Sequence, residues 1–144
     1  GKATTWMIVG SALVLISHII NTFAPQGVPF YAYIAIALLG IGYSLVPSAM
    51  WPSVPKIIPE KNLGTAYSLI YWVQNLGMWA GPLYVGRIFT KGITEAGNHA
   101  QEVSAAIHAE YIFILLGVVA IAVALMFFFS SKKHPELRLD EPAQ

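Results

Sequence analysis

Three long stretches of the chain contain no Asp, Glu, Lys or Arg, and they constrain the fold more than any other feature. They are residues 3–55, 62–86 and 111–131. Only 10% of the 144 residues are charged and 56% are hydrophobic, whereas a soluble domain carries roughly a quarter charged residues. Uncharged stretches of this length cannot provide a hydrated surface. The sequence therefore predicts a membrane protein.

Four apolar segments are long enough to cross a bilayer as helices, which requires about 20 residues at 1.5 Å of rise per residue. The segments are residues 4–23, 30–51, 63–89 and 111–130. Lipid offers the backbone no hydrogen-bond partner and the segments lack the alternation of barrel strands, so we expect an all-α polytopic fold. Residues 1–131 would form the four-helix membrane region, and residues 132–144 a cytoplasmic C-terminal tail.

The basic residues near the segment ends predict the orientation, because short cytoplasmic loops are enriched in Lys and Arg. If the N-terminus is cytoplasmic, the basic residues inside are Lys2, Lys56, Lys61, Lys132, Lys133 and Arg138. Only Arg87 and Lys91 then lie outside, beside Glu95, Glu102 and Glu110. We therefore expect both ends of the chain to be cytoplasmic.

Composition and motifs argue against several function classes. The absence of cysteine excludes disulfides and thiolate metal sites. The chain has no Ser-His-Asp set, zinc-ligand pattern or phosphate-binding loop, and no basic cluster suited to nucleic acid. We expect no enzyme activity, no metal, no cofactor and no nucleic-acid partner. The predicted partners are the lipid bilayer and a small-molecule solute.

Polar side chains recur on one predicted face of the third segment, edged by Met78. Amides that face lipid unpaired are costly, so this face must meet protein or water. It fits either a substrate pathway with neutral donors and acceptors, or hydrogen bonding between helices. Together with one tyrosine of the second segment, the predicted pathway residues are Tyr43, Tyr67, Tyr71, Gln74 and Asn75.

Two further features of the segments have a structural and a functional interpretation. Gly77 and Gly81 form a G-x-x-x-G motif followed by Pro82, so we expect these residues to be packing or hinge positions. His18 is the only ionisable side chain of residues 4–23, which makes it a functional candidate. With Ser17 beside it, we interpret it as a polar packing contact. The segments contain no carboxylate, so we expect no proton relay.

The order of these features resembles the major facilitator superfamily. A Gly-Lys pair leads into the first segment, and "PEKNLGTAY" and "QNLGMWAGPLYVG" follow in the order that those transporters show. The stretch "GYSLVPSAMWPSVPKIIPEKNLGTAYSLIYWVQNLG" is also similar to the branch that includes the lysosomal dipeptide uniporters and their bacterial relatives. The points of similarity are Trp51-Pro52, Pro59-Glu60, Leu63 to Tyr67 and Gln74 to Gly77.

By this resemblance, the four segments are helices nine to twelve of a twelve-helix carrier, and the remaining helices of that carrier are partners of this chain. The resemblance implies a secondary transporter that works by alternating access. We expect a small polar organic solute, with a dipeptide favoured, and uniport. The alternatives are a sugar or drug carrier of the same superfamily, or a non-transporting helical subunit or scaffold. A cytoplasmic (inner) membrane is favoured, with a lysosomal membrane as the alternative.

The resemblance also places the proline-rich stretch, which contains Pro47, Pro52, Pro55 and Pro59, where the tenth helix leaves the membrane on the cytoplasmic side. Each proline removes a helical hydrogen bond and disfavours a helical conformation for the residue before it. Irregular backbone is tolerated only near water or protein, so we expect this stretch to border the inner mouth of the pathway. The predicted inner-gate residues are Pro47, Trp51, Pro52 and Pro55.

Overall fold

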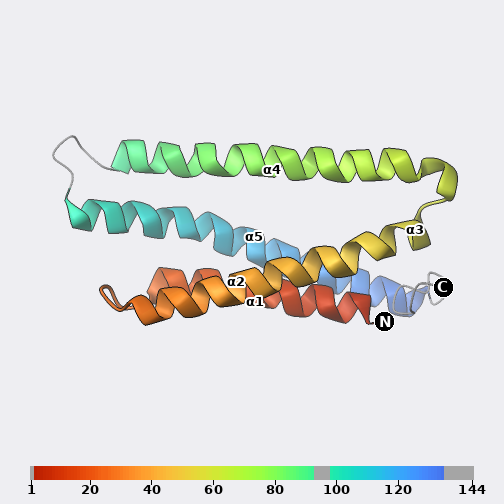
Figure 1. Ribbon diagram of the computed structural model, residues 1–144, viewed down its shortest axis with the longest axis horizontal. Coiled ribbons are helices and arrows are strands. Elements are labelled where there is room, and N and C mark those ends of the chain that lie inside the picture. The colour runs from red at the N-terminus through yellow and green to blue at the C-terminus, as the bar shows by residue number, and fades with distance from the viewer. Residues whose placement is uncertain (1, 93–97, 135–144) are drawn as a thin grey trace.

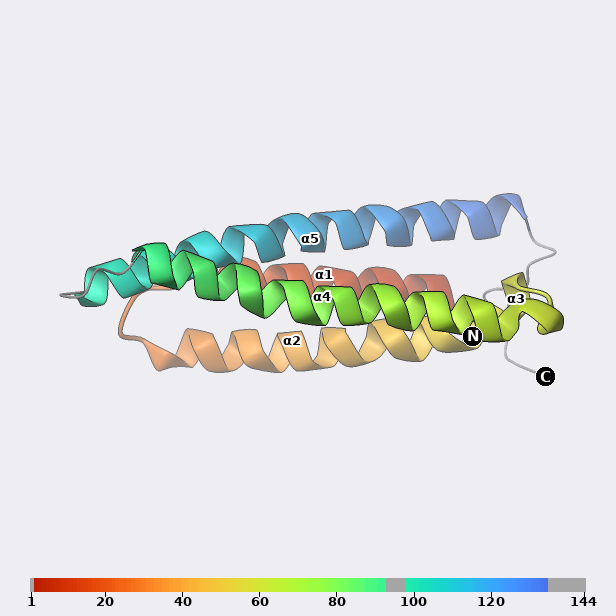
Figure 2. The same ribbon diagram turned by 90° about the horizontal axis from the view of Figure 1, so that it is seen from above.

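The computed structural model describes residues 2–92 and 98–134, and these are helical nearly throughout, with no strand among them. The long helices are α1 (Ala3–Phe23), α2 (Pro29–Met50), α4 (Leu63–Gly92) and α5 (His99–Lys133). Three short ones, η1 (Trp51–Ser53), α3 (Val54–Ile57) and η2 (Glu60–Asn62), connect α2 to α4. The long helices alternate in direction along one elongated bundle (Figures 1 and 2). The prediction of an all-α fold is confirmed.

Three helices, α1, α2 with its continuation to Ile57, and α5, are long and apolar enough to cross a membrane. With 30 residues, α4 is long enough, but within the described part of the chain it is not among those three. Its polar side chains, which include Gln74, Asn75, Arg87 and Lys91, make it less apolar than the others. The protein is a multi-pass membrane protein, and the fourth span remains a prediction.

The last helix, α5, begins at His99, so it extends well before the predicted segment at residues 111–130. Asn98 caps it, because its side-chain oxygen accepts a hydrogen bond from the backbone N–H of Gln101 at 3.1 Å. Glu102 and Glu110, which precede the predicted segment, are therefore helical. Both lie in α5, while Glu95 lies outside the described residues.

The helices α1, α2 and α5 form a packed trio in which α1 contacts both of the others. At the crossing of α1 and α2, a Cβ added to Gly42 would lie 2.7 Å from the carbonyl oxygen of Gly10. On the other side of α1, a Cβ added to Gly117 of α5 would lie 3.1 Å from the Leu15 side chain. Glycine therefore allows the backbones of the trio to come this close.

In contrast, α4 is separated from α1 and α2 along much of its length (Figure 1). It contacts the trio mainly through α5, and no residue of α4 is buried. A Cβ added to Gly77 or Gly81 would meet nothing within 4 Å. The helix also continues unbroken through Pro82. The proposed packing role of the G-x-x-x-G motif therefore has no partner among the described residues.

Candidate functional site

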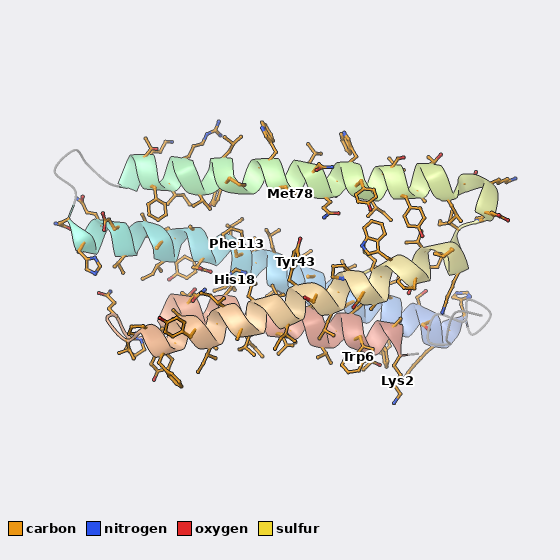
Figure 3. The ribbon with its side chains drawn as sticks, in the orientation of Figure 1. Lys2, Trp6, His18, Tyr43, Met78 and Phe113 are labelled. Carbon is orange, nitrogen blue, oxygen red and sulfur yellow. The ribbon has the colours of Figure 1, made fainter. Side chains whose placement is uncertain are left out.

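The predicted pathway residues lie on two helices, Tyr43 on α2 and the other four on α4; Figure 3 labels Tyr43 and also Met78, which edges the polar face of α4. Tyr43 is 64% exposed and Tyr71 is 53% exposed, and both amides are exposed as well. Tyr67 is half-buried. A helix predicted to lie in a membrane thus presents phenol and amide groups on a face that the described residues leave uncovered.

The hydrogen bonds of this polar face stay within α4 or reach the adjoining connection. The Asn75 side-chain nitrogen donates to the backbone oxygen of Tyr71 in the same helix at 2.8 Å. The Tyr67 hydroxyl lies 3.5 Å from the backbone oxygen of Trp51. Across residues 2–92 and 98–134, no hydrogen bond engages the side chain of Gln74. The polar face of α4 therefore does not bond α4 to the trio within the described structure.

The predicted inner-gate residues form the corner that joins α2 to α4. Pro47 lies inside α2, while Pro52 and Pro55 belong to the short helices that follow. The Trp51 ring packs against two rings at the start of α4, with centroids 5.6 Å from Tyr67 and 4.9 Å from Tyr71. This aromatic cluster thus connects the proline-rich corner directly to the first turns of the polar face.

A largely apolar pocket of about 420 Å³ lies near this corner, lined by parts of α1, α2, α3, α4 and α5. Met50, Val54, Ile70 and Phe127 contribute to its wall, whereas none of the predicted pathway residues does. Its lining is suited to hydrocarbon rather than to a polar solute. The polar face of α4 and this pocket are therefore separate features.

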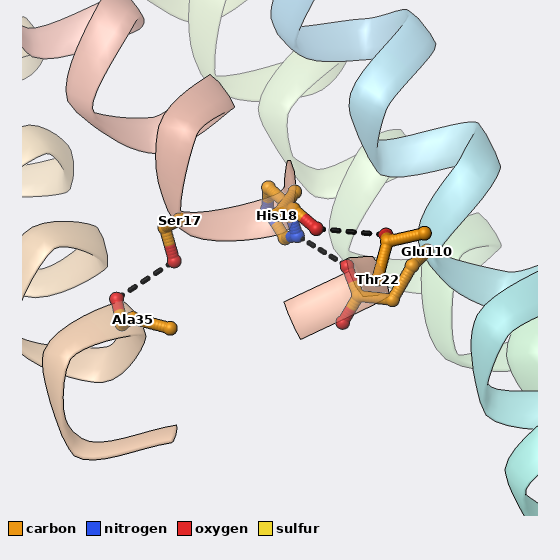
Figure 4. A network of polar contacts seen from close by, with 5 residues as sticks. All are labelled: Ser17, His18, Thr22, Ala35 and Glu110. Atoms are coloured by element: carbon orange, nitrogen blue, oxygen red, sulfur yellow. Dashed lines mark hydrogen bonds and ion pairs between the residues drawn. The ribbon is translucent and has the colours of Figure 1, made fainter. Parts of the chain in front are cut away.

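A contact that the sequence analysis missed joins α1 to α5 near the turn between α1 and α2 (Figure 4). The Nδ1 atom of His18 lies 2.7 Å from Oε2 of Glu110, and the imidazole stacks on the Phe113 ring, with centroids 5.1 Å apart. His18 is thus a polar packing contact, as predicted, but with a partner 92 positions away. The nearby Ser17 hydroxyl instead donates to the backbone oxygen of Ala35 in α2 at 2.7 Å.

The signal that could have located this pair is the helical register of α5. If α5 is extended backwards to the Asn98 cap, Glu110 and Phe113 fall three residues apart, on one face of a helix. The described residues contain no group of three or more His, Cys, Asp or Glu side chains that could hold a metal ion. The pair is therefore a link between helices and not part of a larger cluster of ligands.

Comparison with known proteins gives one consistent family. The family model described as Major Facilitator Superfamily matches residues 1–144. The Lysosomal dipeptide transporter MFSD1 of Danio rerio is 31% identical over 140 residues, which cover 96% of this chain and 27% of the relative. The human protein of that name is 38% identical over 88 residues, covering 61% of this chain and 18% of the relative.

The corresponding Mus musculus protein is 39% identical over 88 residues, covering 61% of this chain and 18% of the relative. The chain therefore spans less than a third of the length of the curated relatives that it matches. No solved structure matches the chain significantly. The fold of apolar helices and the match of the family model along the whole chain lead to one conclusion: the chain belongs to the major facilitator superfamily.

Proposed function

We propose that this chain is part of a secondary transporter that moves a small polar organic solute across a membrane by alternating access. Family membership supports a carrier rather than an enzyme. Because the chain is much shorter than its relatives, the complete pathway requires helices beyond those described. Within this chain, we assign the solute-facing role to the polar face of α4 together with Tyr43 of α2.

The observation that carries the proposal is the uncovered state of that polar face. Tyr71 and both amides are exposed on α4, although polar groups in a membrane must meet protein or water. The trio uses its polar side chains differently, because Ser17 and His18 bond one helix to another. Neutral donors and acceptors that remain uncovered are what an aqueous pathway for a polar solute requires.

A dipeptide is the solute that we favour. The relatives that match this chain are named as dipeptide transporters, and peptide groups offer the donors and acceptors that amide and phenol side chains recognise. A sugar is the nearest alternative, because hydroxyl groups would meet the same donors and acceptors. Trp51 and the neighbouring Pro47, Pro52 and Pro55 would form the inner gate, where the Trp51 ring contacts Tyr67 and Tyr71 of the polar face.

Ligand-dependent thermal stability of the full-length protein tests the proposal. A ligand that binds only the folded state raises the free energy of unfolding by mass action, by about 2.7 kcal/mol at a hundredfold excess over Kd, and the unfolding midpoint rises with it. We expect a dipeptide to raise the midpoint in the wild type and in Thr90→Ala, but not in Gln74→Ala. Thr90 is a matched control, since its exposed hydroxyl on the same helix donates only to the Gly86 backbone oxygen at 2.9 Å.

The other outcomes separate the alternatives. A shift with a sugar or a drug alone would keep the carrier and discard the dipeptide. No shift with any ligand, together with a lower midpoint for Gln74→Ala without ligand, would favour the non-transporting scaffold. Gln74 would then bond to helices outside this chain instead of facing solute.

A further inference from the structure

The contact between His18 and Glu110 differs from the other histidine–carboxylate pair of the described residues. His99 and Glu102 lie on neighbouring turns of α5, 3.9 Å apart, with side chains 81% and 59% exposed. His18 and Glu110 lie on different helices, 2.7 Å apart, with side chains 14% and 23% exposed. Only the second pair is both close and largely shielded, and only it connects two elements of the bundle.

The surroundings of the pair contain few other groups that can change charge. Neither α1 nor α2 contains any Asp, Glu, Lys or Arg. On α5, the exposed His108 ring contacts Ser104 of its own helix and Tyr111. On α4, Arg87 and Lys91 are exposed and make no ion pair with the described residues. The neighbour of the imidazole on its other side is Phe113, which is uncharged.

The pair also has a route to water. Glu110 lines an open pocket of about 500 Å³, together with Asn21, Thr22 and residues of the turn between α1 and α2. The charge bias of the sequence predicts that this end of the bundle lies on the non-cytoplasmic side. A proton from that side could reach the carboxylate and the imidazole without crossing the apolar part of the trio.

A shielded carboxylate is stabilised when its partner carries a positive charge, and a hydrogen bond to an ionised donor is stronger than one to a neutral donor. Histidine is the side chain whose charge ordinarily changes between about pH 5 and pH 8. Uptake of one proton would convert the contact from a bond with neutral imidazole into an ion pair. The attraction between α1 and α5 would thereby increase.

We propose that His18 and Glu110 form a proton-binding site that ties α1 to α5 at the non-cytoplasmic end of the bundle. Its ligand is the proton itself, and Phe113 holds the imidazole in place by stacking. The site does not depend on the identity of the solute, so failure of the proposed transport function would leave it standing.

The test is the unfolding midpoint of the full-length carrier, measured between about pH 5 and pH 8. We expect the midpoint of the wild type to exceed that of His18→Gln by more at low pH than at high pH, because protonation of the imidazole turns its bond with the carboxylate into an ion pair. Glu110→Gln should lose the same pH-dependent difference, and the double variant should lose no more than either single one. His99→Gln, in the exposed pair, should follow the wild type at every pH.

Identical pH dependence of the wild type and all these variants would overturn the proposal. If the His18 variants do not fold, NMR of the wild-type carrier labelled with ¹⁵N-histidine tests the same site without any substitution. The His18 signals are assigned through their proximity to the Phe113 ring, and we expect them to change from the imidazole to the imidazolium form as the pH falls. Signals that keep one form throughout would also overturn it.

Discussion

The packed trio and α4 are both built from long, mainly apolar helices, but they use their small and polar residues in opposite ways. In the trio, Gly10 and Gly42 bring two backbones together, and Ser17 hydrogen-bonds from one helix to the next. On α4, Gly77 faces open space, and Asn75 bonds only to its own helix. The same residue types therefore pack helices together in one region and form an uncovered surface in the other.

The difference teaches that a residue type in a membrane helix does not reveal its role without the neighbouring helix. Small residues favour close packing only where a second backbone is present to approach. Polar residues stabilise a bundle only where a partner lies within hydrogen-bond distance. The trio meets both conditions, and α4 meets neither along its middle, which is why α4 is the region that we assign to solute.

The largest effect should come from adding one methyl group to the trio. Gly42→Ala would place a Cβ 2.7 Å from the Gly10 oxygen and 3.0 Å from the Val14 nitrogen, both of them backbone atoms. We expect the full-length carrier to lose about 3 kcal/mol of unfolding free energy, near the upper end of the usual cost of overpacking. In Gly40→Ala, on the same helix, the added Cβ meets nothing within 4 Å, so this variant should be nearly neutral. Equal losses of unfolding free energy in the two variants would contradict a special role for close packing in the trio.

Trp51→Ala should have the next largest effect, because it removes the contact between the α2–α4 corner and the start of α4. Two ring pairs are lost, each worth about 0.5–1.5 kcal/mol, so we expect a loss of roughly 2 kcal/mol. Transport should fall as well if Trp51 belongs to the inner gate. Trp72→Ala is the control, since that ring is 62% exposed on α4; a similar loss there would show that α4 is held elsewhere.

A smaller effect is expected from the hydrogen bond that joins α1 to α2. Ser17→Ala removes a bond of 2.7 Å to the Ala35 oxygen from a fully buried position, at a cost of about 1 kcal/mol. Ser44→Ala removes an exposed hydroxyl that bonds only to Gly40 of its own helix. Unfolding in denaturant should show the loss for Ser17 alone, and a loss of equal size at Ser44 would contradict a special role for polar groups in the trio.

The smallest effect within this chain is expected at Gly77→Ala. Alanine replaces glycine in an exposed helical position with open space around it, so the helix should gain at most about 0.5–1 kcal/mol. A clear loss of stability in the full-length carrier would instead show that another helix of the protein packs against this position. In that case, the trio and α4 would differ only in where their packing partners lie: within this chain for the trio, and outside it for α4.

Much of the architecture could be predicted because a helix that crosses a bilayer needs about 20 apolar residues in a row. Segments without charge and about 20 residues long are helices in such a setting, and three of the predicted segments lie in helices that are long and apolar enough to cross. The start of α5 was harder to predict. A helix that leaves the apolar layer can continue through polar residues such as Glu102, and its true beginning depends on the local cap at Asn98.

The sequence predicted which side chains share one face of α4, but not whether other helices cover that face. Helical spacing aligned Tyr71 with Gln74, yet only the structure shows that the trio leaves both uncovered. Which glycines meet a neighbour was also not predictable, since the close approach uses single glycines on separate helices instead of the G-x-x-x-G motif on α4. These contacts join residues far apart in the chain, and no local pattern encodes them.

By itself, the sequence determined that this chain forms membrane helices, where the turn between α1 and α2 lies, and to which family the chain belongs, because length, charge and local spacing carry that information. Only the tertiary structure decided which faces meet. His18 and Glu110 become partners because the crossing of α1 and α5 brings them within 2.7 Å, and the polar face of α4 stays uncovered because no helix of the trio packs over it. Both outcomes depend on the relative placement of whole helices, which is set by the packing of many distant residues at once.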